Sequence, residues 1–552
     1  MNEEIKICQN CKQSFKIEPN DFGFYEKMKV PVPEDCPECR QQLRMVFRNF
    51  KTLYKRKCDK SDKMIVSMYD SNTPFPVYDI SEWWGDSWEG GEYAMDIDWE
   101  APFFTQLALL HNKVPHISLV NVKSENSDYS NMVFASKNTY LLFGNVENED
   151  CDYGHIVWNS RDSIDNLYLF KSESCYECVD CLGSTKLFYS QESESCVDSI
   201  GLFDCRNCLN CIGCVGQVNK SYCIFNKQVT REAYKEFLAE HPLNEKSSID
   251  YILNEREALR KVLPQRSFFG SHNDNVSGNH IYNAHNIQHS FDIKSGENSS
   301  YCYTVRSAID SYDVTFTVDV SECYEAINCI GNKLIGCHNA YESHDVYFSH
   351  YCYNCDNIFG CFGLRKKSYC IFNKQYTKEE YQDLLPKLIE HMKKNNEWGT
   401  FFPKELSPFA YNEAIGNEYM PLSKEEALAQ GFTWKDHIPS TTGQGTIENS
   451  NLPKNPEEYS DELLKEIFTC TSCSKNYKLI NREINFYKKN KLALPEQCFN
   501  CRHTKRMQMR NPRNLWPAKC AKCEKEILTS YTPEGQTEYN IYCEKCYQQE
   551  VY

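Results

Sequence analysis

Cysteine pairs with two intervening residues occur at both ends of the 552-residue chain, and four such thiolates can bind one metal ion tetrahedrally. The sequence holds three sets of two pairs: Cys8, Cys11, Cys36 and Cys39; Cys470, Cys473, Cys498 and Cys501; and Cys520, Cys523, Cys543 and Cys546. All-thiolate ligation favours Zn²⁺, with iron as the alternative. Because four protein ligands leave no open coordination position, we expect three structural zinc sites rather than catalytic ones.

The elements that position these cysteines can be predicted from the first set. Residues 15–17 and 22–25 read as short strands of a hairpin, and Pro37 suits the first turn of a helix that begins at the second pair. The helix dipole favours thiolates at that end. This arrangement predicts a treble-clef or zinc-ribbon module.

The two ends of the chain are copies of each other. Residues 8–57 align with residues 470–519 at a constant offset of 462, without a gap. At the same offset Cys58 matches Cys520, but Ser61 stands where Cys523 does and no further cysteine pair follows. The N-terminal copy of the third module is therefore predicted to be a finger that has lost its metal.

The first two zinc modules are each followed by a basic stripe in a chain of net charge −16. Arg40, Arg44 and Arg48 are spaced four residues apart and share one helix face, and Arg502, Arg506 and Arg510 repeat them. The remaining basic candidates nearby are Lys51, Lys505 and Arg513. One guanidinium group can bind two phosphate oxygens at once, so RNA or DNA is the first partner expected. An acidic protein surface, of this chain or of a partner, and plain solvation are the alternatives.

The middle of the chain is also duplicated. Residues 208–234 recur as residues 355–381 at an offset of 147, including the segment Ser221–Gln228, which returns as Ser368–Gln375. Within each copy, small polar residues and cysteine or aromatic residues alternate in steps of 9–13 residues, so that two steps are expected to make one coil of about 22 residues. This spacing predicts a two-lobed parallel β-helix, a solenoid, with a sandwich or propeller as alternatives.

The cysteines from Cys151 to Cys370 are predicted to be small buried residues that stack inside the solenoid. The run Cys205, Cys208, Cys211 and Cys214 resembles an iron–sulfur motif in spacing, but it lacks the ferredoxin pattern of a three-residue step and a following proline. Disulfides are not expected, because the chain is long and its cysteine count of 31 is odd.

These patterns predict a multidomain, mainly-β protein in which interspersed helices accompany two solenoid lobes flanked by zinc-ribbon modules. Thr377-x-x-Glu380 and Ser423-x-x-Glu426 predict capping boxes, and Thr230 is predicted to begin a third helix. The predicted parts are residues 1–60 (zinc ribbon), 61–118 (an aromatic and acidic segment that plugs the first lobe), 119–228 (first lobe), 229–265 (helical connector), 266–375 (second lobe), 376–435 (helical), 436–458 (linker) and 459–552 (tandem zinc module).

Two groups of residues are candidates for active sites. Residues 79–104 combine tryptophans with carboxylates, as in a carbohydrate-binding or carbohydrate-active site, but an aromatic plug has the same composition. His272, His280, His285 and His289 match no metal-ligand spacing. Because no phosphate loop, dinucleotide fingerprint or nucleophile elbow is present, a non-enzymatic function is favoured.

The start of the chain lacks a signal-peptide pattern, and no apolar run is long enough to span a bilayer, so a cytoplasmic protein without membrane contact is expected. The pattern of residues 8–40, with its cysteine pairs, Phe24-Tyr25 and the closing Cys-Pro-x-Cys-Arg, resembles small bacterial zinc-ribbon modules. The whole layout resembles an uncharacterised bacterial family that joins such modules to cysteine-rich repeats. That resemblance implies zinc binding and supplies no activity. The function expected is binding of nucleic acid or a ribonucleoprotein, with a protein–protein scaffold as the alternative.

Overall fold

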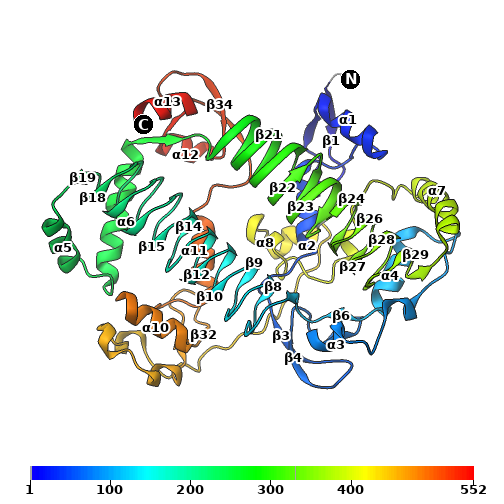
Figure 1. The fold of residues 1–552 in the computed structure, drawn as a ribbon, viewed down its shortest axis with the longest axis horizontal. Coiled ribbons are helices and arrows are strands. Elements are labelled where there is room, and N and C mark those ends of the chain that lie inside the picture. The colour runs from blue at the N-terminus through cyan, green and yellow to red at the C-terminus, as the bar shows by residue number, and fades with distance from the viewer. Residues whose placement is uncertain (1–2, 330, 552) are drawn as a thin grey trace. The chain divides into compact units, whose positions relative to one another are not determined.

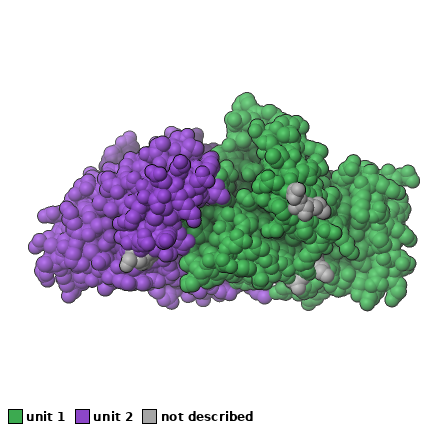
Figure 2. Space-filling model, turned by 90° about the horizontal axis from the view of Figure 1, so that it is seen from above, with its two compact units in different colours: residues 1–119, 268–436, 513–515 green, residues 120–267, 437–512, 516–552 purple. Residues whose placement is uncertain are grey.

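The computed structural model describes residues 3–329 and 331–551, and the chain forms two compact units, each built from separate stretches of sequence. Unit 1 comprises residues 1–119, 268–436 and 513–515, and unit 2 comprises residues 120–267, 437–512 and 516–552 (Figure 2). The N-terminal cysteine module therefore shares a unit with the second half of the central repeat, and the C-terminal modules share a unit with the first half.

Short parallel strands occupy residues 120–228 of unit 2, which we call the first stack (Figure 1). Its strands are β7 (Asn121–Val122), β8 (Asn131–Phe134), β9 (Phe143–Val146), β10 (Glu149–Asp152), β11 (His155–Trp158), β12 (Arg161–Ile164), β13 (Leu167–Phe170), β14 (Val179–Leu182), β15 (Thr185–Phe188), β16 (Val197–Ile200), β17 (Leu209–Ile212) and β18 (Ser221–Ile224). The strand β19 (Lys227–Gln228) closes the stack by pairing antiparallel with β18.

The second stack, residues 268–375, is the corresponding part of unit 1 (Figure 1). Its parallel strands are β21 (Gly270–Ser300), β22 (Tyr303–Ile309), β23 (Tyr312–Ile327), β24 (Gly331–Ile335), β25 (His338–Tyr341), β26 (His344–Tyr347), β27 (His350–Tyr353), β28 (Asp356–Phe359) and β29 (Ser368–Ile371). It ends like the first stack, with an antiparallel partner strand, β30 (Lys374–Gln375).

Neighbouring strands of a stack follow each other closely in sequence. Leu167 pairs with Val179 between β13 and β14, and Val197 pairs with Leu209 between β16 and β17. Neighbouring strands are therefore separated by one step of the sequence repeat. The expectation that one coil contains two such steps is wrong. The second stack departs from this register where Val320 of β23 pairs with Gly331 of β24, an interval shorter than the usual one.

The repeated turns depend on residues that tolerate the left-handed backbone region. In the first stack every third residue has a positive φ, for example Asp162 at 46°, Asp165 at 56° and Tyr168 at 54°. Asn and Asp reach this region more easily than most residues, because their short side chains bond to the nearby backbone. The frequent Asn and Asp residues of the central repeat are thus explained by its tight turns.

The interior of each stack is lined by small side chains that satisfy their own polar atoms. Cys178 donates its thiol hydrogen to the Leu187 carbonyl oxygen at 3.1 Å, and the Ser184 hydroxyl accepts the Cys196 amide at 3.1 Å. The cysteines from Cys151 to Cys370 are all free and buried. This confirms that they fill the cores of the stacks, where a larger polar side chain would leave hydrogen bonds unmade.

Helices follow or flank the stacks, and thirteen α-helices occur among the described residues. Their bounds are α1 (Pro19–Met28), α2 (Pro37–Val46), α3 (Ile80–Trp84), α4 (Phe103–Lys113), α5 (Arg231–Glu240), α6 (Lys246–Val262), α7 (Lys378–Lys394), α8 (Gly416–Tyr419), α9 (Lys424–Ala429), α10 (Asn481–Asn490), α11 (Phe499–Gln508), α12 (Pro533–Glu538) and α13 (Glu544–Val551). The predicted capping boxes at Thr377 and Ser423 are present, and Thr230 caps α5. None of these helices is long and apolar enough to cross a membrane.

The cysteine modules are built from a β-hairpin and helices. The hairpins are β1 (Glu4–Ile7) with β2 (Ser14–Ile17), β31 (Phe468–Thr469) with β32 (Asn476–Tyr477), β33 (Trp516–Lys519) with β34 (Glu526–Thr529), and, in the predicted metal-free copy, β3 (Tyr54–Lys57) with β4 (Met64–Ser67). The expected strand at residues 22–25 is wrong. These residues are helical, because Pro19 at the first turn and the Glu18–Asp21 capping box begin α1 there.

Candidate metal centres and the arginine clamps

Three cysteine tetrads come together as the spacing predicts. In each of the sets Cys8/Cys11/Cys36/Cys39, Cys470/Cys473/Cys498/Cys501 and Cys520/Cys523/Cys543/Cys546, all four sulfur atoms lie within 4.8 Å of one another. The Sγ atoms of Cys11 and Cys36 are 3.7 Å apart, those of Cys473 and Cys498 are 3.7 Å apart, and those of Cys523 and Cys543 are 3.8 Å apart. A tetrahedral ion with metal–sulfur bonds of about 2.3 Å requires sulfur atoms about 3.8 Å apart. The tetrads are therefore positioned to bind a metal ion and are consistent with Zn²⁺.

Local backbone geometry directs the sulfur atoms toward each other. The residue after each first pair has a positive φ, namely Lys12 at 62°, Ser474 at 59° and Glu524 at 58°. This turn directs backbone amides of the loop toward the first cysteine of each set. The amides of Cys36 and Cys543 donate to the sulfurs of Cys8 and Cys520 at 3.3 Å, which stabilises negative charge on those thiolates.

The second pair of each of the first two sets begins a helix. Cys36 is the N-cap of α2 and Cys498 is the N-cap of α11. Each helix therefore places its positive dipole end beside the sulfurs, and its following turns carry the first two arginines of the stripe. The third arginine, Arg48 or Arg510, lies two residues beyond the end of its helix.

In unit 2 the stripe of α11 faces inward, onto carboxylates of the first stack. The guanidinium of Arg506 lies 2.9 Å from Asp165 and 2.9 Å from Glu177. Arg502 lies 2.9 Å from the other oxygen of Asp165, and Arg510 lies 2.7 Å from Asp180. The side chains of Arg506 and Asp165 are both fully buried, so this clamp lies in an interior.

Unit 1 repeats this clamp between α2 and the second stack. Arg44 lies 3.2 Å from Asp313 and 2.6 Å from Glu325, and Arg40 lies 2.9 Å from the other oxygen of Asp313. Burial raises the pKa of the Glu325 carboxyl, and the guanidinium groups of Arg44 and Arg40 oppose that rise. Arg48 packs on an aromatic ring, with its guanidinium 4.4 Å from the Phe50 ring centroid, and burial lowers its pKa to about 10.

The carboxylates of the two clamps correspond as the arginines do. Asp313 follows Asp165 by 148 residues, and Glu325 follows Glu177 by the same interval. The next position differs, because Asn328 stands where Asp180 stands in unit 2. The duplicated feature is therefore a cysteine module together with the acidic patch on which it packs.

These contacts correct the expected role of the stripe. The sequence predicts that Arg40, Arg44, Arg48, Arg502, Arg506, Arg510 and Arg513 face a phosphate backbone, but the side chain of each is at most 7% exposed. Arg513 lies 2.7 Å from Asp292, and Lys51 lies 3.3 Å from Glu418. Lys505 is exposed. The alternative from the sequence, an acidic surface of the same chain, describes what the buried arginines contact.

The predicted metal-free finger keeps the shape of its metal-binding counterpart. Asp62 repeats the positive φ of the cysteine loops, at 57°, and the Asp79 amide donates to the Cys58 sulfur at 3.3 Å. Burial raises the pKa of Cys58, but hydrogen bonds from Ser61 and from backbone amides outweigh burial and lower it. No second cysteine pair follows in the sequence, so other interactions must hold this finger together.

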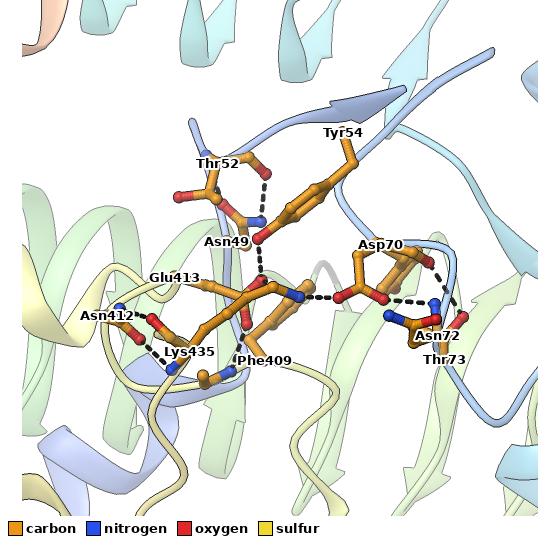
Figure 3. Close-up of polar contacts among 12 residues, drawn as sticks. Asn49, Thr52, Tyr54, Asp70, Asn72, Thr73, Phe409, Asn412, Glu413 and Lys435 are labelled. Carbon is orange, nitrogen blue, oxygen red and sulfur yellow. Dashed lines mark hydrogen bonds and ion pairs between the residues drawn. The ribbon is translucent and has the colours of Figure 1, made fainter. Parts of the chain in front are cut away.

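Tryptophans and a polar cluster stabilise it instead. Trp83 is fully buried, donates to the Pro115 carbonyl oxygen at 2.9 Å and packs edge-on against Tyr353 of the second stack. The plug formed by residues 79–104 therefore packs on the second stack, and the expectation that it plugs the first lobe is wrong. On another side, Tyr54 donates to Glu413, and Lys435 forms an ion pair with Asp70 (Figure 3).

The acidic partners are the functional residues that the sequence analysis missed. Their signal is present in the sequence, since the carboxylates recur at a constant interval just as the arginines do. Of the histidines considered as ligands, His285 lies 3.0 Å from Asp274 in an exposed pair, and His289 lines a pocket described below.

Comparison of the sequence with protein-family models and with curated proteins finds no match.

Proposed function

We propose that this protein is a non-enzymatic scaffold made of two β-solenoids, each braced by a zinc module that acts as an internal clamp. The parallel strands, their regular register and the left-handed turns at every third residue support the solenoid assignment. The full burial of Arg44 and Arg506 against carboxylates of the stacks carries the proposal.

Zinc is the metal proposed for the three tetrads, because all-cysteine ligation at tetrahedral spacing suits it best. Cys36 and Cys498 would hold it at the start of α2 and α11. The bound ion would fix each helix start, so that the arginines one and two turns later meet their carboxylates. Structural zinc contributes roughly 10–16 kcal/mol of folding free energy in small modules, enough to order a segment that has little core of its own.

Binding of nucleic acid is the competing function, and it makes a different prediction. Phosphate binding by the stripe would release counterions and give an affinity that falls steeply with salt. Arginines that already neutralise buried carboxylates cannot supply this interaction without opening the clamp. The scaffold proposal therefore predicts protein partners, and it predicts no affinity for RNA or DNA that falls steeply with salt.

The test combines metal analysis with fluorescence anisotropy on labelled single-stranded RNA and duplex DNA at low and high salt. We expect about three zinc ions per chain and no salt-dependent binding. The matched variant is Lys505→Gln, which changes an exposed lysine on α11. If the protein binds RNA or DNA with an affinity that falls steeply with salt, and Lys505→Gln weakens that binding, nucleic-acid binding replaces the scaffold proposal. A metal content well below three ions per chain would overturn the zinc assignment.

A further inference from the structure

A pocket of about 550 Å³ opens in unit 1 between α1 and the second stack. Its size falls within the range of about 300–1,000 Å³ that is typical of small-ligand sites. Its lining differs from a typical apolar site, because asparagine, glutamine, serine and histidine side chains make much of the wall.

A ladder of amides forms the wall on the side of the stack. The side-chain nitrogen of Asn275 donates to the oxygen of Asn286 at 2.9 Å, and the nitrogen of Asn286 donates to Asn298 at 3.0 Å. The imidazole of His289 stacks on Tyr301, with ring centroids 5.6 Å apart and planes 9° apart. The pocket thus combines a row of amide donors and acceptors with a flat aromatic neighbour.

The duplicated unit shows which parts of this wall belong to the common framework. Tyr301 donates to Asp21 at 3.0 Å, as Tyr153 donates to Glu483 at 2.9 Å in unit 2. Lys27 lies 3.1 Å from Asp310, as Lys489 lies 2.7 Å from Asp162. These corresponding pairs hold α1 and α10 on their stacks in the same way.

The positions between them have diverged. In unit 2, Arg482 crosses to the stack and lies 2.5 Å from Asp152 and 3.7 Å from Asp150. In unit 1 the corresponding residues are Asn20, Ser300 and Asn298, and all three line the pocket. An ion-pair bridge has thus been replaced by three short neutral side chains that cannot span the gap.

A second pair of substitutions at the same wall also makes unit 1 more polar than unit 2. Tyr140 and Leu141 of unit 2 correspond to Gln288 and His289 of unit 1, which both line the pocket. Aromatic and aliphatic surface has been exchanged for hydrogen-bonding surface. These exchanges leave hydrogen-bonding groups rather than apolar surface facing the pocket.

We propose that this pocket binds a short neutral oligosaccharide of two or three units. Amides both donate and accept hydrogen bonds, which matches the dual character of sugar hydroxyls. The carboxylates Glu18 and Asp310 at the lining can accept from further hydroxyls and disfavour an anionic ligand. Lys27, the lining cation, is already bonded to Asp310 and Glu322, so it offers little to a phosphate or carboxylate.

The experiment is titration calorimetry on the full-length metal-loaded protein with cellobiose, maltose, mannobiose and chitobiose, and with a uronic-acid disaccharide as the anionic comparison. We expect at least one neutral disaccharide to bind with a Kd at or below about 1 mM and the anionic one to bind more weakly. Failure of all four neutral sugars to bind at that level would overturn the proposal.

Variants locate the binding in this pocket. Asn20→Arg/Asn298→Asp/Ser300→Asp rebuilds the bridge of unit 2 and is expected to weaken binding at least 10-fold. If the triple variant folds poorly, the single variant Asn298→Asp takes its place, because Asn298 is an exposed member of the amide ladder. The matched control is Arg482→Asn, which removes the bridge in unit 2 and should leave the affinity unchanged. Unchanged affinity in a folded triple variant, or in Asn298→Asp where the triple variant is unfolded, would refute the assignment.

Discussion

Replacing Arg506 with methionine tests whether the zinc modules act as clamps. The substitution keeps the unbranched aliphatic part of the side chain but removes the guanidinium that faces Asp165 and Glu177, each 2.9 Å away. Breaking a buried ion pair by removing one partner costs about 3–5 kcal/mol, because the other partner stays buried without compensation. Asp165 keeps Arg502 at 2.9 Å, so the loss should fall near the lower end, about 3 kcal/mol.

A loss of this size is measurable by thermal unfolding. One kcal/mol lowers the melting temperature of a domain of 150–250 residues by roughly 2–4 °C, so we expect a decrease of roughly 6–12 °C for the transition of unit 2. The metal content of the folded protein should not change, since no cysteine is altered. The neighbouring substitution Lys505→Gln, at an exposed position on the same helix, should stay within about 0.5 kcal/mol of the wild type.

A double variant separates the ion pair from a general packing effect. Glu177→Gln removes one of the two carboxylates that lose their partner in Arg506→Met, so the two changes together should be less destabilising than the sum of the single changes. The reasoning is refuted if Arg506→Met melts like Lys505→Gln, because the buried contacts would then contribute nothing to stability.

Three further predictions follow from other parts of the molecule. Cys498→Ser should lower the metal content from about three ions per chain to about two and destabilise unit 2, as measured by metal analysis and urea unfolding; an unchanged metal content would contradict the ligand assignment. Trp83→Ala should cost about 3–5 kcal/mol in unit 1, because it empties a fully buried site beside a finger that lacks a second cysteine pair; a loss below about 1 kcal/mol in urea unfolding would show that the tryptophan core is dispensable. Burial lowers the pKa of four histidines in unit 1: that of His111 to about 4, and those of His116, His338 and His350 well below 6.5. Neighbouring histidines lower the pKa of His116 and His350 further, and the charge of Arg48 does the same for His338. Because the unfolded chain binds these protons first, stability should be complete above about pH 6.5 and fall by up to roughly 5 kcal/mol per pH unit below it; denaturation series at several pH values would check this, metal analysis of the same samples would separate it from acid release of the ions, and a flat profile at constant metal content would disprove it.

The cysteine sites could be predicted from sequence because their chemistry is local. Two residues between cysteines and a helix-starting proline after Cys36 are enough to specify a thiolate knuckle and the helix that follows. The buried cysteines of the repeat were predictable for a similar reason, since small apolar residues at regular steps fit a narrow interior.

The direction of the arginine stripe could not be predicted from the helix alone. A stripe at four-residue spacing looks the same whether it faces solvent or a buried carboxylate, and the deciding residues, Asp313 and Asp165, lie 269 and 341 residues away from Arg44 and Arg506. The coil length expected from the sequence is too long, because one step of the repeat, as from Leu167 to Val179, already joins neighbouring strands and is not half a coil. The strand expected at residues 22–25 gave way to α1 because capping at Glu18 outweighs the strand preference of the aromatic residues.

The composition of each unit from distant stretches has a consequence for synthesis on the ribosome. Arg44 emerges 269 residues before Asp313, so at about 5–20 residues per second α2 waits roughly 15–50 s for its acidic partner. The first stack waits still longer for α11, because 341 residues separate Asp165 from Arg506. Neither unit can be completed from the first half of the chain. The nascent protein therefore carries an unpaired basic helix during the synthesis of 269 residues and an unpaired acidic patch during the synthesis of 341 residues. Early metal loading of the N-terminal tetrad would keep the basic helix formed until its partner is synthesised.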